Sequence, residues 1–160
     1  RRISHQKHRR IIITVLALTA SIISIGSSYW RQNKHSTFNE GLWFECTNTE
    51  CFSKMVTTDW MKSCQALMVL GCILNFVCTI LFVLSIYSDD LLDPLQRYTG
   101  TMMFFAGTFH FIALTLYLVR NMKEEGALRL QWSYFTGWGA FLFNFVLVVD
   151  VAVFSLAPLE

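Results

Sequence analysis

Four long apolar runs constrain this chain more than any other feature of its sequence. They cover residues 11–29, 64–87, 98–119 and 133–154, and each is near or above the roughly 20 residues that a helix needs to cross a ~30 Å hydrocarbon core. The runs lack the alternation of membrane barrel strands. A soluble four-helix bundle is the alternative, but each of its helices would carry a polar face, whereas polar residues in these runs are isolated. The sequence therefore predicts four transmembrane helices in a lipid bilayer.

The composition agrees with this and argues against several other classes of protein. Hydrophobic residues make up 54% of the chain and charged residues only 15%, whereas soluble domains average about half and about a quarter. The net charge is +2, and no basic face is interleaved with aromatic residues, so we expect no nucleic-acid partner. No convergent set of nucleophile, base and orienting group is visible. We therefore expect no enzyme, no catalytic residues, no cofactor and no small-molecule substrate.

Charges in the loops predict the orientation of the chain. The segment 1–10 carries five Arg and Lys residues, which favours a cytoplasmic N-terminus. The loop 88–97 has one Arg against three Asp, and the loops on the other side carry more basic residues, which leans the other way. Because the first helix usually dominates, we expect both termini in the cytoplasm of a multi-pass plasma-membrane protein. The extracellular loops would then be 30–63 and 120–132.

Cys46 and Cys51 are the only cysteines in the predicted loop 30–63. Disulfides persist outside the cytosol, so with this orientation the two thiols would pair. The bond would pin a hairpin-like turn and stabilise it by about 2 kcal/mol. A zinc site is the rival interpretation, but two cysteines without a second pair of ligands nearby make a poor one. We predict a disulfide and no metal.

Three polar residues lie near the middle of predicted spans. Asn75 and Asn144 each lie eleven residues into a span from one side, and His110 lies twelve residues in from the other. At 1.5 Å per residue all three are about 16–18 Å deep. Since unpaired polar groups are costly in hydrocarbon, we expect them to face the bundle interior and hydrogen-bond across helices. We favour this structural cluster over pH sensing, ion conduction or catalysis.

Small residues recur along the first span at spacings that let helices approach closely. We expect this stripe to pack within the bundle rather than against a partner. Its members are Ala17, Ala20, Ser21, Ser24 and Ser28.

Asp150 lies seventeen residues past Ser133, where the fourth span begins, so it is only a few ångströms from the predicted inner surface. Three roles are open to it: a solvated carboxylate, a pair with Arg9 or Arg10, and a contact to a partner subunit.

Aromatic residues crowd the third and fourth spans on several sides, so they cannot all point inward. The outward ones face lipid, which is the ordinary case, or another protein. The candidates for a protein contact are Phe104, Phe105, Phe141 and Phe145.

The first loop carries a recognisable order of residues. Trp30, then Gly41-Leu42-Trp43, then Cys46 and Cys51 resemble the W…GLW…C…C signature of the claudin superfamily. That superfamily includes the peripheral myelin and epithelial membrane proteins, the lens fibre intrinsic membrane protein and the calcium-channel gamma subunits. The stretch "QWSYFTGW" at 131–138 resembles the entry to the fourth span in the lens protein and the gamma subunits.

The resemblance covers essentially the whole chain, residues 1–160. It implies one all-α membrane domain, a four-transmembrane-helix bundle with a small disulfide-pinned extracellular β-sheet. It also implies that Trp30, Gly41, Leu42 and Trp43 are structural, because they would pack where that sheet meets the bundle.

Departures from true claudins point to particular branches. Only four residues separate the two cysteines, Gln65 stands where claudins typically carry an arginine, and the second loop is short. The chain is therefore closer to the lens-type and gamma-type members. Their resemblance implies lateral association with a larger channel or receptor as an auxiliary subunit. The alternative is cell–cell adhesion or junctional structure, with a like protein on a neighbouring cell as partner. A conducting pathway is a third reading, but no span carries a run of buried charges.

Overall fold

The computed structural model of this chain describes most of its length. The ranges it describes are 2–32, 38–47, 49–54, 57–85, 92–123 and 129–156.

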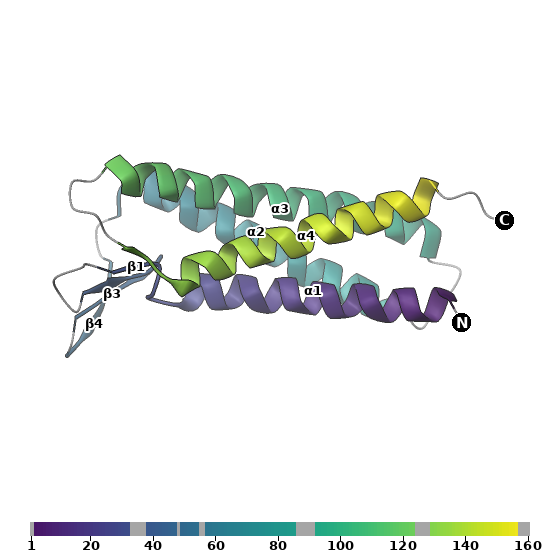
Figure 1. Cartoon of the computed structure of the whole chain (residues 1–160), viewed down its shortest axis with the longest axis horizontal. Coiled ribbons are helices and arrows are strands. Elements are labelled where there is room, and N and C mark those ends of the chain that lie inside the picture. The colour runs from purple at the N-terminus through teal and green to yellow at the C-terminus, as the bar shows by residue number, and fades with distance from the viewer. Residues whose placement is uncertain are drawn as a thin grey trace.

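Four long helices form an elongated bundle, with a small sheet at one end (Figure 1). The helix α1 packs beside α2 and α4, and α3 also packs beside α2 and α4. The beginning of α1 and the end of α4 lie at the end opposite the sheet. The helices are α1 Arg2–Gly26, α2 Asp59–Leu84, α3 Leu92–Lys123 and α4 Trp132–Leu156.

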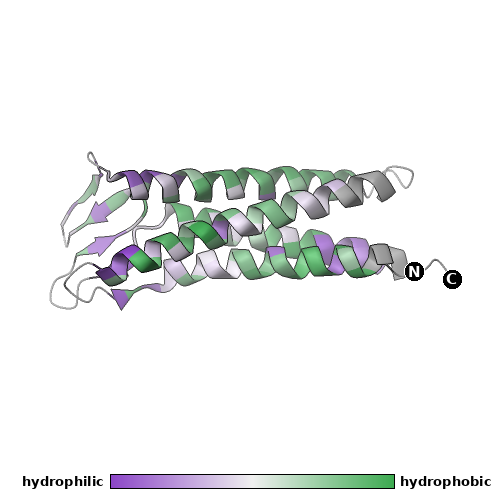
Figure 2. Cartoon of the chain, turned by 90° about the horizontal axis from the view of Figure 1, so that it is seen from above, coloured by the Kyte–Doolittle hydropathy of each residue, from purple (hydrophilic) through white to green (hydrophobic). Residues whose placement is uncertain are grey.

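All four helices contain a segment long and apolar enough to cross a membrane. The buried share of these segments ranges from 28% to 39%. Most of their apolar side chains therefore point outward. In Figure 2, hydrophobic residues run along the helices, and hydrophilic ones gather in the sheet and toward the opposite end of the bundle. A soluble bundle would instead expose polar side chains on the outer faces of its helices. The predicted membrane-spanning bundle is confirmed.

The helices extend beyond the predicted apolar runs. The helix α1 begins at Arg2 rather than at residue 11, so Lys7, Arg9 and Arg10 lie on its first turns. The helix α2 begins at Asp59, five residues before its apolar run, where a carboxylate is favourable beside the free N–H groups of a helix start. Arg120 and Lys123 lie in the last turn of α3, where basic side chains complement the opposite end of the helix dipole.

The sheet has five short antiparallel strands in the order β4-β3-β2-β1-β5. Four strands come from the segment between α1 and α2, and β5 comes from the connection between α3 and α4. The register places Arg31 opposite Glu40 and also opposite Leu130. The strands are β1 Arg31–Gln32, β2 Asn39–Glu40, β3 Phe44–Cys46, β4 Cys51–Ser53 and β5 Arg129–Leu130.

Two apolar clusters form the core. The first lies next to the sheet and contains Trp30, Leu42, Met61, Cys64, Met68, Ala113, Leu114, Tyr117 and Tyr134. The second lies toward the other end of the bundle and contains Cys78, Phe82, Met103 and Leu147. Between these clusters the inward stripes of the helices carry polar residues.

Candidate functional site

Trp30 connects the sheet to the bundle. Its side chain is fully buried, and its indole N–H donates to the carbonyl oxygen of Ser24 in α1 at 2.6 Å. Its ring packs edge-on against Tyr117 of α3 and Tyr134 of α4, with centroids 4.8 and 5.8 Å away. Its backbone N–H donates to the backbone carbonyl oxygen of Glu40 in β2 at 3.0 Å. Trp30 therefore holds the sheet with its backbone and three helices with its side chain.

Gly41 lies where the chain turns between β2 and β3. Its N–H donates to the carbonyl oxygen of Phe44 at 2.8 Å. A Cβ at this position would overlap the backbone of Ser27 and Ser28, which follow the end of α1. Only glycine allows this close approach of two backbone segments.

The next two residues of the turn complete its attachment. Leu42 is fully buried, and its carbonyl oxygen accepts from Gln65 Nε2 of α2 at 2.8 Å. The carbonyl oxygen of half-buried Trp43 accepts from the Lys54 N–H at 3.0 Å. Gln65, the residue that departs from the claudin pattern, thus ties α2 to the turn.

Cys46 and Cys51 form a disulfide, which confirms the predicted pairing. The two residues lie opposite each other in the β3–β4 hairpin, and the Thr47 N–H donates to the Glu50 carbonyl oxygen at 2.8 Å within the turn. Within the described ranges no three His, Cys, Asp or Glu side chains come together as metal ligands.

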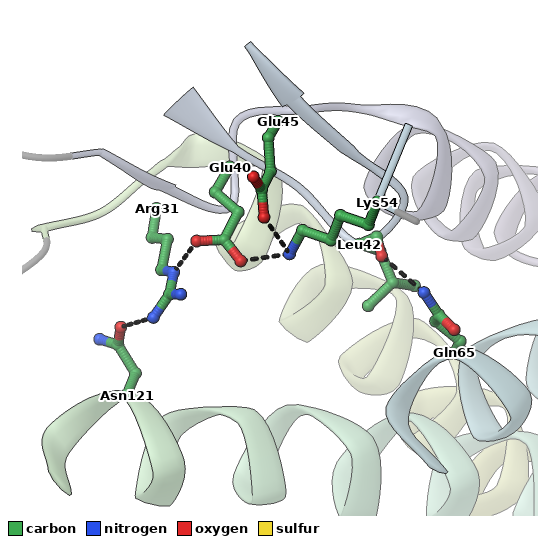
Figure 3. A network of polar contacts seen from close by, with 7 residues as sticks. All are labelled: Arg31, Glu40, Leu42, Glu45, Lys54, Gln65 and Asn121. Carbon is green, nitrogen blue, oxygen red and sulfur yellow. Dashed lines mark hydrogen bonds and ion pairs between the residues drawn. The ribbon is translucent and has the colours of Figure 1, made fainter. Parts of the chain in front are cut away.

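A buried ion-pair network lies under the sheet (Figure 3). Glu40 accepts from Arg31 Nε at 2.5 Å with one carboxylate oxygen and pairs with Lys54 Nζ through the other. The side chains of Glu40 and Lys54 are only 6% and 5% exposed. Lys54 also approaches Glu45 at 3.9 Å, and Arg31 donates to Asn121 of α3 at 3.3 Å. The network therefore joins three strands and the segment after β4 to the bundle.

Sequence reasoning did not find this network. Charged residues in a polar loop are usually solvated, and only the strand register places Arg31 directly opposite Glu40. Two-residue strands carry no alternation that would predict the register.

Asn75 and His110 meet through a third residue, Ser21 of α1. All three side chains are fully buried. Ser21 Oγ lies 3.0 Å from His110 Nε2 and 3.1 Å from Asn75 Nδ2. The other ring nitrogen, Nδ1, lies 2.7 Å from the carbonyl oxygen of Ala106, one turn earlier in α3. The three side chains connect α1, α2 and α3 at one level of the bundle.

Asn144 is also fully buried, but it lies apart from this set of hydrogen bonds. Neither Nδ2 nor Oδ1 of Asn144 has a hydrogen-bond partner in the described part of the chain. It packs against Gly107 of α3, where a Cβ would lie 3.3 Å from Asn144 Cβ. Gly107 is three residues before His110, so Asn144 is about one turn from the level of the imidazole.

Asp150 is paired within the chain at the end of the bundle opposite the sheet. Its Oδ2 accepts from Arg10 Nε at 2.6 Å, and its Oδ1 pairs with Arg9 Nη2. The Arg10 side chain is 6% exposed and that of Arg9 59%. Lys7, one turn earlier, donates to the carbonyl oxygen of Ser85 after α2 at 3.2 Å. The start of α1 therefore contacts both α4 and the end of α2.

Aromatic rings line the outer surface of α3 and α4. Phe111 of α3 contacts Phe141 and Trp138 of α4 with centroids 5.5 and 5.8 Å apart, and Phe141 contacts Phe145 at 6.4 Å. We call the exposed set the aromatic face. It consists of Phe104, Phe105, Phe111 and Phe145, with half-buried Phe141 between the helices.

Comparison with known proteins agrees with this architecture. The chain matches the model of the PMP-22/EMP/MP20/Claudin family over residues 9–149. It is 28% identical over 137 residues to claudin domain-containing protein 2 of Mus musculus, a match that covers 84% of this chain and 78% of the relative. It is 24% identical over 148 residues to epithelial membrane protein 1 of Homo sapiens, covering 86% and 87%. A shorter match, 34% over 83 residues, covers 49% of this chain and 48% of epithelial membrane protein 3 of Rattus norvegicus.

The family match runs through all four spanning helices and through the disulfide-bonded sheet. It agrees with the resemblance carried by Trp30, the Gly41-Leu42-Trp43 turn and the two paired cysteines. This chain is a four-span membrane protein of the PMP-22/EMP/MP20/Claudin family.

Proposed function

We propose that this protein is non-enzymatic and associates laterally with a larger membrane protein, a channel or receptor, as an auxiliary subunit. In this proposal the protein lies in the plasma membrane with the sheet outside the cell and both termini in the cytoplasm. The basic residues at the start of α1 support that orientation.

The observation that carries the proposal is the aromatic face. Lipid tails are as apolar as leucine, so association within a bilayer depends on close packing rather than on hydrophobicity. Rigid aromatic rings supply a large contact area at low entropic cost. Phe104 and Phe111 lie two turns apart on one side of α3, and Phe145 on α4 is 57% exposed. In this proposal another transmembrane helix packs against these rings.

The small size of the sheet also supports lateral association. Its strands have two or three residues, and three charged side chains at the sheet, Arg31, Glu40 and Lys54, are directed into the ion-pair network rather than outward (Figure 3). The lateral surface of the bundle is much larger than the tip of the sheet.

The test is a mild-detergent purification of the tagged full chain from cells that express it naturally, followed by mass spectrometry. The variant replaces Phe104, Phe141 and Phe145 by leucine, which keeps the helices apolar enough to insert. The matched control is Phe76→Leu, an equally exposed phenylalanine on α2. We expect a stoichiometric larger partner with the wild type and the control, and at least a tenfold loss with the triple variant. Equal recovery with all three chains would reject the aromatic face as the contact.

Adhesion is a second candidate, favoured by two exposed aromatics on the sheet. Phe44 in β3 and Phe52 in β4 are 43% and 55% exposed, and β4 is an edge strand. Expression in non-adherent cells discriminates the two roles. Clustering of the protein at cell contacts, reduced by Phe52→Ser and unaffected by the triple leucine variant, would support adhesion instead of lateral association.

A further inference from the structure

At the centre of the bundle, several buried side-chain polar atoms have no hydrogen-bond partner among the described residues. We infer that the centre is an internal water site, in which the buried amides of Asn75 and Asn144 bind one or more water molecules within about one helical turn of His110. This inference does not depend on which of the two cellular roles the protein has.

The proton positions around His110 can be assigned from the contacts. Ala106 O only accepts, so His110 Nδ1, at 2.7 Å, carries a hydrogen. In the neutral imidazole, Nε2 is then an acceptor, and Ser21 Oγ at 3.0 Å is the group that donates to it. The hydroxyl has a single hydrogen, so the 2.9 Å contact of Ser21 Oγ with Ala17 O is not used at the same time.

The amide of Asn75 is oriented by the same constraint. Because the Ser21 hydrogen is donated to His110, Ser21 Oγ accepts, and Asn75 Nδ2 donates to it at 3.1 Å. This leaves Asn75 Oδ1, a buried acceptor that no described group satisfies. The hydrogen bonds therefore run in one direction, from Asn75 through Ser21 to His110, and their starting residue has an open carbonyl oxygen.

Asn144 adds an open donor and an open acceptor nearby. Both of its amide atoms are buried without a partner in the described part of the chain. Gly107 and His110 lie on the same inward stripe of α3, and Asn144 packs directly against Gly107. An unpaired buried amide atom is costly, so three such atoms near one level indicate a bound ligand.

Water fits these open groups better than a cation does. A water molecule both donates and accepts, and buried waters in proteins typically join groups that are otherwise unpaired. A cation would pair with the two amide oxygens but would leave Asn144 Nδ2 open. None of the fully buried residues described at this level is a carboxylate, so a cation would also be an uncompensated charge in the membrane.

The experiment is water–amide cross-relaxation by NMR on the full chain in nanodiscs with deuterated lipids. In a sample labelled with ¹⁵N-asparagine, we expect the side-chain NH₂ groups of Asn75 and Asn144 to show cross peaks with the sign of long-lived bound water. The Asn75→Leu and Asn144→Leu spectra assign the signals. The control is a ¹⁵N-alanine sample, in which the buried Ala113 and Ala140 should show no such peaks.

Several results would overturn the inference. The first is the absence of water cross peaks at both amides in the folded wild type, which requires no variant to fold. A rise in melting temperature for Asn144→Leu would also reject it, because a dry unpaired amide is better replaced by an apolar group. A melting temperature that increases when choline is replaced by sodium would assign the site to a cation instead.

Discussion

Nε2 of His110 on α3 lies 3.0 Å from the hydroxyl oxygen of Ser21 on α1. This contact joins two helices that are not neighbours in the chain, and Asn75 adds the third helix through the same hydroxyl. The first prediction concerns the contribution of the His110–Ser21 contact to the free energy of unfolding. His110→Leu removes the acceptor of Ser21 from a fully buried position, so we expect a loss of about 1–3 kcal/mol of stability. Thermal unfolding in detergent measures this.

The matched control for that variant is Thr108→Val. Thr108 lies on the same helix, but its hydroxyl donates only to the Phe104 carbonyl oxygen of its own helix at 2.8 Å. We expect its melting temperature to stay close to that of the wild type. Equal stability of His110→Leu and wild type would show that the interhelical contact contributes nothing to the fold.

Gly71 provides a second test of the same region. A Cβ on Gly71 would lie 2.5 Å from His110 Cε1 and 2.6 Å from Nδ1, while both ring nitrogens of His110 are held by hydrogen bonds. Gly71→Ala should therefore destabilise by about 1–3 kcal/mol, the usual cost of overpacking a core. Gly139→Ala is the control, since a Cβ there has nothing within 4 Å and alanine favours a helix by about 1 kcal/mol. If both variants unfold at the same temperature, His110 is not held as rigidly as its contacts indicate.

The network under the sheet predicts a large difference between two glutamates. Glu40→Gln removes the carboxylate that bridges Arg31 and Lys54, and breaking a buried pair by removing one partner costs about 3–5 kcal/mol. Glu45→Gln removes only a half-exposed carboxylate 3.9 Å from Lys54, so we expect at most about 0.5 kcal/mol. Limited proteolysis of the loop and thermal unfolding report both effects. Similar behaviour of the two variants would exclude a structural role for the network.

The contacts of Asp150 predict unequal roles for two adjacent arginines. Arg10→Gln removes a buried partner, with its Nε 2.6 Å from Asp150 Oδ2, and should speed hydrogen exchange at both the start of α1 and the end of α4. Arg9 is mostly exposed, so Arg9→Gln should change exchange little. Hydrogen-exchange mass spectrometry in nanodiscs measures both helix ends. Faster exchange with Arg9→Gln than with Arg10→Gln would contradict the assignment of the buried pair.

The disulfide allows a test of the proposed orientation. Cys46→Ser leaves Cys51, an exposed residue of β4, with a free thiol. If the sheet is outside the cell, a membrane-impermeant maleimide should label this variant on intact cells, while the wild type stays unlabelled. Labelling that requires permeabilised cells would place the sheet in the cytosol. The same variant should lose about 2 kcal/mol of stability, because the closed loop is short.

The large features of the fold follow from one-dimensional patterns. Apolar runs of about 20 residues are sufficient to predict membrane helices, and loop chemistry was sufficient to predict the bond between Cys46 and Cys51. The exact helix limits were not predictable in this way, because a helix does not end where hydrophobicity ends. The helix α1 continues outward through basic residues, where Arg10 pairs with Asp150.

The polar contacts show where sequence reasoning stops. Depth along a helix places Asn75, His110 and Asn144 at similar levels, but depth does not give the direction in which a side chain points. The structure joins the first two through Ser21, which the sequence presented only as one member of a small-residue stripe. It places Asn144 against Gly107 instead. Rotation of each helix about its axis, set by packing, decides such pairs.

The strand β5 has a consequence for protein engineering. It adds to β1 with Leu130 opposite Arg31, and the Gln131 N–H donates to the Trp30 carbonyl oxygen at 2.9 Å. The two connections at this end of the bundle are therefore one hydrogen-bonded unit. Chimeras that transplant a single connection from a relative would sever that unit, so grafts intended to transfer specificity need to exchange both segments together.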